Sequence, residues 1–336
     1  ELCGSRTKQK YFCTFCGILD GDKCKHGKAQ TFRKGEIDIK PYFDQALKKI
    51  DEIHYPDLIK GVRGTANKDH IPERLEKGIL RAKNNVYVNK DGTIRYDMTE
   101  LPLTHFKAGE ITTSVSKLKE LGYDKDIKGK DIKSDDQIIE LKPQDVILPS
   151  STLGLDESAD NVLFRVAAFV DEELSKLYGL EPYYDLKDKG DLAGQLVIGL
   201  APHISAGMVG RIIGFSQTQA LFAHPLYHAA LRRDCDGDEA CVMLLMDAFL
   251  NFSRQYLPDK RGGRTMDAPL VLNYTLNPAE VDDMVQGLDV GWTYPLEFYE
   301  AALDYKNPWD VDIEQLNSRL GSPLQYENMG FTHDVS

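Results

Sequence analysis

Apolar side chains recur every three to four residues over several parts of the chain. The clearest case runs from Asn161 to Leu180, where Val162, Val166 and Phe169 share one side of an expected helix. Residues at this spacing lie on one face of an α-helix, so the pattern predicts a helix with a buried apolar face. The same spacing predicts further helices over 41–53, 72–81, 113–121, 241–256, 281–288 and 296–303.

Shorter runs of β-forming residues, separated by glycines, predict strands. Residues 196–204 and 209–215 are two such runs, and Ala206-Gly207 and Gly210 interrupt them. Glycine allows the sharp bends that the corners of a small barrel require. The pattern therefore favours a small closed barrel, and 268–274 is expected to form another strand.

A hairpin and a polar connection are predicted in the first half of the chain. Two β-rich runs, 86–88 and 93–96, flank Asp91-Gly92, a dipeptide typical of hairpin turns. Residues 124–136 carry mixed charges and are the best candidate for an internal boundary. This division predicts three regions: 1–30, a mixed α/β region with the hairpin over 31–135, and a barrel region with flanking helices over 136–336.

Three carboxylates alternate around one glycine in the run Arg-Arg-Asp-Cys-Asp-Gly-Asp-Glu over 232–239. Alternate residues of an extended segment point the same way, and Gly237 permits a tight bend. Asp234, Asp236 and Asp238 are therefore expected to converge on one small volume. A divalent cation would neutralise their charges, and carboxylate oxygens favour Mg²⁺, Mn²⁺ or Ca²⁺.

A calcium loop of the EF-hand type is excluded at this motif. Counted from Asp234, such a loop needs glycine at its sixth position and glutamate at its twelfth. The chain has Glu239 and Leu245 at those positions. The simpler structural alternative is an acidic surface turn that caps a following helix.

Four of the six cysteines lie within the first 24 residues: Cys3, Cys13, Cys16 and Cys24. Cys13 and Cys16 have the spacing of a zinc knuckle, and reduced intracellular thiols favour a metal over disulfides. We therefore predict a structural zinc ribbon over 1–30 with these four cysteines as ligands. The fourth ligand stays open between a residue before Glu1, Cys24 and His26, and stray reduced cysteines are the alternative.

The composition is that of a folded protein with no membrane partner. The chain has 336 residues, 42% of them hydrophobic, which is enough for two or three compact units. No run approaches the ~20 apolar residues of a membrane span, and no signal-peptide pattern is present, so we expect a cytoplasmic protein. The first residue is not Met, and the chain reads as a piece of a longer protein. Its net charge of −12 argues against a domain that only coats nucleic acid.

Several long segments, in the same order along the chain, carry a family resemblance. The most specific one is AHPLYHAALRRDCDGDEACVMLLMDAFLNFSRQYLPDKRGGRTMDAPLVL, over 223–272. The others are IPERLEKGILRAKNNVYVNKDGTIRYD (71–97), LPLTHFKAGEI (101–111), LVIGLAPHISAGMVGRIIGF (196–215), YPLEFYEA (294–301) and FTHD (331–334). From Tyr42 almost to its end, the chain resembles the large catalytic subunit of the archaeal family D DNA polymerase.

This resemblance implies an α+β fold with a double-psi β-barrel core of the two-barrel polymerase type, surrounding helices and an N-terminal zinc ribbon. It implies a DNA-directed DNA polymerase that transfers a deoxynucleotide from a dNTP to a primer 3′-hydroxyl during replication. Asp236 and Asp238 match the carboxylates that hold the two catalytic Mg²⁺ ions. Asp234 stands where the family has asparagine, which makes the motif more similar to the three-aspartate motif of multisubunit RNA polymerases.

Basic residues near the motif are candidates for triphosphate or template contacts, since the arginine fork suits phosphate geometry. They are Arg232, Arg233, Lys260, Arg261 and Arg264, and ordinary solvated surface is the alternative. The resemblance implies that the partners are primer–template DNA, dNTPs and a small proofreading exonuclease subunit in a heterodimer. It also implies a sliding clamp that binds outside this chain, and a location at the nucleoid.

Two other functions remain open at the level of sequence. The third aspartate favours an RNA polymerase-type subunit with the two-barrel architecture. A non-catalytic, zinc-containing scaffold that binds DNA or a partner protein is the alternative of a different class. His224 and His228 are four residues apart and could be metal ligands on one helix face, but packing is favoured because Mg²⁺ prefers oxygen ligands to imidazole.

Overall fold

The computed structural model describes residues 9–33, 36–54, 56–62, 73–150, 157–257, 268–280, 286–290, 293–327 and 329–330. Contacts divide the chain into two compact units, Glu1–Ala46 and Leu47–Ser336. The predicted boundaries at residues 30 and 135 stay a prediction, although the polar connection at 124–136 lies within the second unit.

The first unit contains two small antiparallel sheets. One pairs β1 (Tyr11–Cys13) with β2 (Gly17–Leu19), and the other pairs β3 (Lys23–Cys24) with β4 (Gly27–Lys28). Each hairpin turn brings cysteines toward the same point. The helix expected over 41–53 is present as α1 (Lys40–Lys49).

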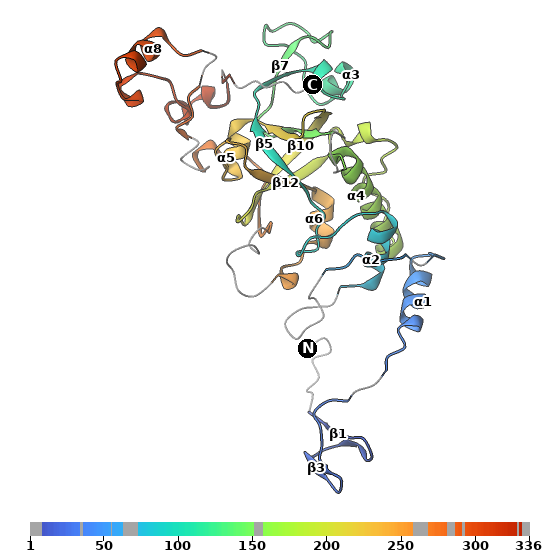
Figure 1. Cartoon of the computed structure of the whole chain (residues 1–336). Coiled ribbons are helices and arrows are strands. Elements are labelled where there is room, and N and C mark those ends of the chain that lie inside the picture. Colours follow the sequence, from blue (N-terminus) through green and yellow to red (C-terminus); the bar gives the residue numbers. More distant parts are fainter. Residues whose placement is uncertain are drawn as a thin grey trace. The chain divides into compact units, whose positions relative to one another are not determined.

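A closed six-stranded β-barrel forms the centre of the second unit (Figure 1). Its strands pair in the order β10, β8, β11, β5, β12 and β9, and β9 returns to pair with β10. The bounds are β5 (Tyr96–Pro102), β8 (Asp145–Pro149), β9 (Leu196–Leu200), β10 (Ala206–Ser216), β11 (Ala220–Ala223) and β12 (Glu239–Leu244). The barrel predicted from short, glycine-broken strands is confirmed. The strand expected over 268–274 is β13 (Val271–Asn273), which pairs with β10 at its edge.

Two apolar clusters join the barrel strands to neighbouring elements. Ile198, Leu200 and Met243 belong to the first, which α6 (Leu245–Asn251) joins through Ala248. The second cluster joins barrel strands to α3 (Val115–Glu120), β6 (His105–Lys107) and β7 (Ile138–Glu140). Figure 1 places α3 and β7 together at one end of the barrel.

Several predicted helices are confirmed. They are α2 (Leu75–Lys83), α3, α4 (Ala159–Glu173) and α8 (Leu296–Leu303), and α4 continues as a short π-helix at Leu174–Tyr178. Helix α4 packs against β5, β8 and β12, which explains its long apolar face. Most of the helix predicted over 281–288 falls outside the described residues.

The helix predicted over 241–256 is wrong in its first part. Residues 239–244 form strand β12 between β5 and β9, and helix α6 begins only at Leu245. Ala240 to Leu244 are all buried, so this strand is apolar on both faces. A continuous apolar run gives no alternation, and periodicity alone does not separate a buried strand from a buried helix.

The hairpin predicted over 86–96 is also wrong, because its residues form a turn without paired strands before β5. Side chains take the backbone groups that a partner strand would have bonded. Arg81 Nη2 donates to the Gly92 carbonyl at 3.3 Å, and the Ile94 amide donates to an Asp247 carboxylate oxygen at 2.7 Å. The turn is thus fastened to α2 and α6.

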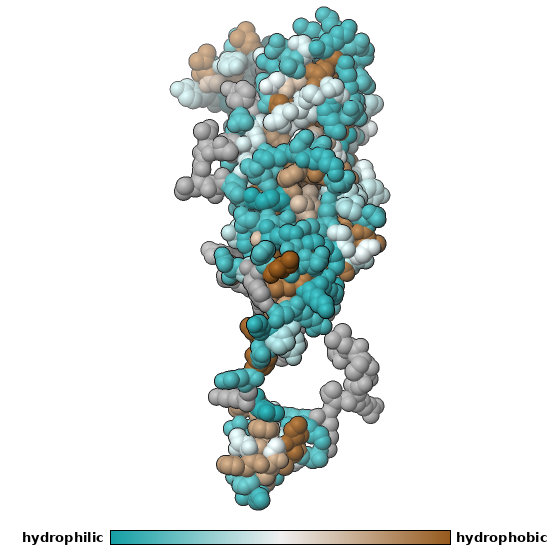
Figure 2. Space-filling view, turned by 90° about the vertical axis from the view of Figure 1, so that its right-hand side faces the viewer, coloured by the Kyte–Doolittle hydropathy of each residue, from teal (hydrophilic) through white to brown (hydrophobic). Residues whose placement is uncertain are grey.

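The described residues contain no helix that is long and apolar enough to cross a membrane. The face shown in Figure 2 is largely hydrophilic, and its hydrophobic side chains form small separate groups.

Candidate functional site

The acidic loop, residues 232–238, joins helix α5 (Pro225–Ala230) to strand β12. Asp234, Asp236 and Asp238 are exposed, and one carboxylate oxygen from each lies within 4.8 Å of the others. The predicted convergence is therefore present. Oxygens bound to one Mg²⁺ at ~2.1 Å lie roughly 3–4 Å apart, so exposed side chains at this spacing suit a hard divalent cation.

Backbone bends, rather than the expected extended segment, bring the three carboxylates together. Arg232, Cys235 and Gly237 have positive φ angles of 61°, 67° and 97°. Glycine adopts this conformation freely, but for Cys235 it is uncommon and carries a cost of about 1–3 kcal/mol. A strained non-glycine residue between two aspartates indicates that the surrounding structure determines the shape of the loop.

Glu100, on barrel strand β5, supports the acidic loop through hydrogen bonds to its backbone. Its carboxylate is fully buried and accepts a hydrogen bond from the Gly237 amide at 3.1 Å. Its own amide donates to the Asp238 carbonyl at 2.9 Å. Burial, together with the charges of Asp236 and Asp238, raises the pKa of Glu100 although the Gly237 amide opposes the shift.

His228, on α5, lies behind Glu100. Its Nδ1 is 3.2 Å from Glu100 Oε2, and its Nε2 is 2.9 Å from the Leu101 carbonyl. Burial lowers the pKa of His228 to about 4. His224 is also buried and caps α5, where its Nδ1 accepts from the Leu226 amide at 3.2 Å. Both histidines are therefore packed inside the protein, and no metal-binding group of the described residues includes them.

Arg233 is the predicted phosphate ligand that the structure brings to the aspartates. Its Nη1 lies 3.6 Å from Asp238 Oδ2, while Nη2 donates to the Pro202 carbonyl at 2.9 Å. Arg232 is exposed and donates to the Glu280 carbonyl at 3.4 Å. The other three predicted phosphate ligands lie outside the described residues: Lys260, Arg261 and Arg264.

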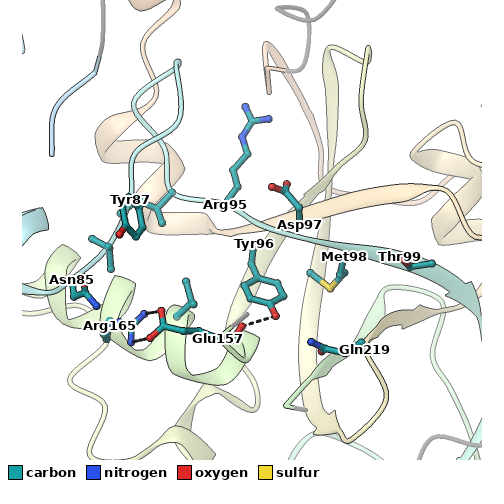
Figure 3. A pocket seen from close by; sticks show the side chains of 13 residues that line it. Asn85, Tyr87, Arg95, Tyr96, Asp97, Met98, Thr99, Glu157, Arg165 and Gln219 are labelled. Carbon is teal, nitrogen blue, oxygen red and sulfur yellow. Dashed lines mark hydrogen bonds and ion pairs between the residues drawn. The ribbon is translucent and has the colours of Figure 1, made fainter. Parts of the chain in front are cut away.

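Two adjoining grooves lie near the acidic loop, and the smaller one reaches it. The larger has a volume of about 760 Å³ and the smaller about 280 Å³, and both are lined by Tyr87, Arg95 and Asp97. The smaller groove also includes Pro202 and Glu239, the residue next to Asp238. Figure 3 shows the Arg95 and Asp97 side chains on the same side of the backbone at the start of β5.

Tyr87 lines both grooves, and 70% of it is exposed. The sequence did not identify it as a site residue. The Lys60 ammonium lies 3.8 Å from the centre of its ring, which is a cation–π contact. Tyr87 belongs to the run that was assigned to a hairpin strand, so its exposure was not predictable from alternation. An aromatic ring open to a polar groove is a common surface for stacking a base.

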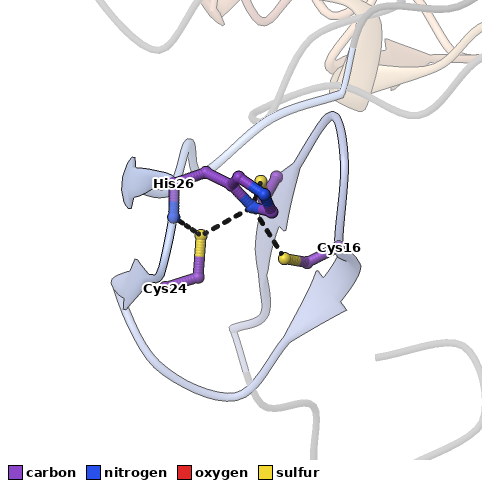
Figure 4. A group of neighbouring side chains, drawn as sticks. Cys16, Cys24 and His26 are labelled. Atoms are coloured by element: carbon purple, nitrogen blue, oxygen red, sulfur yellow. Dashed lines mark hydrogen bonds between the residues drawn. The ribbon is translucent and has the colours of Figure 1, made fainter.

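A second ligand cluster lies in the first unit, where Cys13, Cys16, Cys24 and His26 converge (Figure 4). His26 Nδ1 is 3.8 Å, 3.1 Å and 4.0 Å from the three sulfurs in that order. Ligand atoms of a tetrahedral zinc ion lie roughly 3.5–3.8 Å apart, so this donor set fits zinc. Amides of the knuckle, led by that of Cys16, lower the pKa of Cys13 to about 6, whereas burial and the neighbouring thiols raise the pKa of Cys16 to about 11. Cys3, the remaining predicted ligand, lies outside the described residues.

Comparison with known proteins assigns the chain to a family. The family described as DNA polymerase II large subunit DP2, catalytic domain, matches residues 52–336. The chain therefore belongs to this family, as the sequence resemblance predicted. The alignment leaves only the first 51 residues unmatched, and these include the cysteine cluster.

Individual relatives cover the whole chain. DNA polymerase II large subunits from Archaeoglobus fulgidus and Methanocella arvoryzae are 49% and 51% identical over 100% and 99% of the chain. The corresponding subunit from Pyrococcus furiosus is 49% identical over 99% of the chain. The chain spans 29%, 29% and 27% of these three relatives, so it corresponds to less than a third of a complete large subunit.

Proposed function

We propose that the acidic loop is the magnesium site of a DNA-directed DNA polymerase and that this chain carries its catalytic aspartates. The observation that carries the proposal is the convergence of Asp234, Asp236 and Asp238 on a loop at the mouth of the barrel. The family supports it, because its members are named as DNA polymerase subunits. In this proposal the barrel has the double-psi form, and a second barrel outside the chain completes the cleft.

Magnesium bound at the loop would lower the pKa of a primer 3′-hydroxyl and neutralise charge on the departing pyrophosphate. Asp236 and Asp238 would hold the metal in this role, with Asp234 as a third oxygen ligand. Arg233 places a guanidinium beside Asp238, where it can attract the triphosphate of an incoming nucleotide. The residues of the chain thus align the substrates and balance charge, which is the main task of a phosphoryl-transfer site.

The larger groove, which adjoins the groove that reaches the loop, offers a place for the nucleic-acid substrate. Its volume of about 760 Å³ is adequate for a nucleotide, and the Tyr87 ring is available for stacking. We assign this groove to bases rather than to phosphates, because both of its arginines already form ion pairs, Arg95 with Asp91 and Arg165 with Glu157. Primer–template DNA and dNTPs are the proposed substrates, and the proofreading subunit and the sliding clamp are proposed partners.

Zinc at the cysteine cluster has a structural role in this proposal. Four protein ligands leave no open coordination position, which distinguishes structural from catalytic zinc. Cys13, Cys16, Cys24 and His26 would fold the first 30 residues around the ion. The small sheets of this unit bury little apolar surface, so a metal supplies stability that a core cannot.

Primer extension by the assembled polymerase tests the proposed function. Asp236→Ala and Asp238→Ala are each expected to reduce extension at least a thousandfold while DNA binding persists. Asp312→Ala, at another exposed aspartate, is the control and should extend normally. Unchanged extension by Asp236→Ala would remove the metal site from the mechanism.

An RNA polymerase-type activity is the second candidate, because Asp234 gives the loop a third carboxylate. Incorporation of ribonucleotides and deoxynucleotides by the same preparation separates the two functions. We expect deoxynucleotides to be preferred by at least a hundredfold. A preference for ribonucleotides would favour the second candidate.

A further inference from the structure

Glu100 holds the loop at two peptides, the one before Gly237 and the one after Asp238. Strand β5 pairs with β12 with Thr99 opposite Glu239, and the Glu100 amide extends this ladder by donating to the Asp238 carbonyl at 2.9 Å. The Glu100 carboxylate then accepts from the Gly237 amide at 3.1 Å. The first of these peptides follows Asp236 and the second follows Asp238, so the two bonds fix the backbone from which both carboxylates extend.

The loop has little other backbone support. Among the described residues, the amides of Asp234, Cys235 and Asp236 have no hydrogen-bond acceptor, and the three aspartates are exposed. Glu100, by contrast, is fully buried on a barrel strand. The shape of the loop therefore depends on a few contacts. Among these, the contact with Glu100 comes from a residue that the barrel holds rigidly.

His228 fixes the other end of the Glu100 carboxylate. Glu100 Oε2 and His228 Nδ1 are 3.2 Å apart and buried, and neither atom has another hydrogen-bond partner in the described chain. The second ring nitrogen of His228 must carry a proton to bond the Leu101 carbonyl. The ring is thus fixed by the Leu101 carbonyl, and its Nδ1 faces Glu100 Oε2 at contact distance.

His228 also holds the start of the loop. Its carbonyl accepts from the Arg233 amide at 3.0 Å. The adjoining pair, Glu100 and His228, therefore contacts the loop immediately before Asp234 and again at Gly237 and Asp238. Contacts at both ends restrict how far the three carboxylates can separate.

We propose that Glu100 is a positioning residue for metal binding, which holds Asp236 and Asp238 at the spacing a divalent cation requires, with His228 keeping Glu100 in place. The inference rests on the proposed function of the acidic loop. Glu100 itself does not bind the metal, because its two oxygens contact Gly237 and His228. Its effect on metal affinity is exerted through the backbone of the loop.

Variants at Glu100 separate the hydrogen bond from the charge. Glu100→Gln keeps an oxygen for the Gly237 amide, and its NH₂ group can donate to His228 Nδ1. Glu100→Leu has a similar size and no acceptor. Glu173 provides a matched control, because it is another fully buried glutamate, bonded to Lys77 and Asn251 at 2.8 Å each, away from the loop.

Mn²⁺ binding, measured by electron paramagnetic resonance on the protein, is the decisive readout. We expect Glu100→Leu to weaken binding at least tenfold and Glu100→Gln to stay within threefold of the wild type. Glu173→Leu is expected to lower the melting temperature without changing Mn²⁺ affinity. Wild-type affinity in a folded Glu100→Leu variant overturns the inference.

Two further measurements keep the result interpretable. If Glu100→Leu fails to fold, Glu100→Asp replaces it, because the shorter side chain cannot reach Gly237 and His228 together. Wild-type Mn²⁺ affinity in Glu100→Asp also overturns the inference. The Asp236→Ala/Asp238→Ala double variant gives the baseline. If the double variant binds Mn²⁺ like the wild type, the proposed metal site is wrong. If the double variant loses Mn²⁺ binding but the Glu100 variants keep wild-type affinity, only the positioning role is contradicted.

Discussion

The Tyr227 hydroxyl donates a hydrogen bond to the Met208 carbonyl of barrel strand β10, 3.1 Å away. Tyr227 is fully buried on α5, directly before His228. It fits there because Gly199 on β9 and Gly210 on β10 have no side chains. This contact connects the position of α5, and thus of His228, to two glycines of the barrel.

Gly210→Ala is expected to destabilise the second unit. A Cβ atom at residue 210 would lie 2.7 Å from the Tyr227 hydroxyl oxygen, which is closer than such atoms approach. Overpacking of a close-packed interior costs about 1–3 kcal/mol. We expect the melting temperature to fall by several degrees in differential scanning calorimetry.

A double-mutant cycle provides the control for this prediction. Tyr227→Phe removes the nearest clashing atom, so Gly210→Ala should cost less in the Tyr227→Phe background than in the wild type. Gly61→Ala, where a Cβ would meet only a Glu73 oxygen at 3.6 Å, should be nearly neutral. Equal costs of Gly210→Ala in both backgrounds would show that Tyr227 is not the obstacle.

His26→Ala is expected to abolish stoichiometric zinc binding, whereas Cys3→Ser is expected to retain it. The three sulfurs and His26 Nδ1 already form a four-ligand set without Cys3. Elemental analysis of the purified variants, after dialysis against a weak chelator, measures the zinc content. The sequence left this choice of ligands open, and the two variants decide it directly.

The opposite pattern would reassign the site. Zinc retained by His26→Ala and lost by Cys3→Ser would make Cys3 the fourth ligand. Cys16→Ser is the positive control, because its sulfur is the one nearest to His26, at 3.1 Å. It should lose zinc whichever residue completes the set.

Much of the fold could be predicted from local pattern. Helix α8 has the predicted bounds, and the amphipathic run at α4 was clear because one face packs on the barrel. Strand β12 was mistaken for helix, since burial on both faces erases the alternation that marks a strand. The turn at Gly92 looked like a hairpin because the sequence does not show that Arg81 would take its carbonyl.

The aspartates were predictable, but their support was not. Asp234, Asp236 and Asp238 form a local motif, and a motif can be read without tertiary structure. Glu100 meets the loop only because β5 pairs with β12, and His228 meets Glu100 because α5 packs against β5. The one available signal was a charged residue within the otherwise apolar end of a strand, which is uncommon unless a partner is present.

Acid is expected to destabilise the protein partly through His224. Burial lowers its pKa from 6.5 to about 3, so between these values the unfolded chain binds a proton that the folded chain does not. This contribution to stability is complete above pH 6.5 and is lost as the pH falls toward 3. At pH 5 the loss is about 2 kcal/mol. Urea unfolding from pH 7.5 to pH 5 measures it.

The His224→Asn variant isolates this contribution. Asparagine can still cap α5 by accepting from the Leu226 amide, but it does not titrate. Its stability should fall less steeply than that of the wild type below pH 6.5, with His228 among the groups that maintain the remaining slope. His54→Asn, at an exposed histidine, should leave the slope unchanged. Identical slopes for His224→Asn and the wild type would contradict the assignment.

Asp234→Asn is expected to preserve polymerase activity but to raise the magnesium concentration that it requires. Asp234 lies with Asp236 and Asp238 in the carboxylate cluster, and an asparagine oxygen can still bind a hard cation. The substitution removes one of three negative charges, so magnesium affinity should fall several-fold while the maximal rate changes less than fivefold. A magnesium titration of primer extension separates the two quantities. Asp236→Asn should instead lose the maximal rate at every magnesium concentration, and a similar loss in Asp234→Asn would make the third aspartate as essential as the other two.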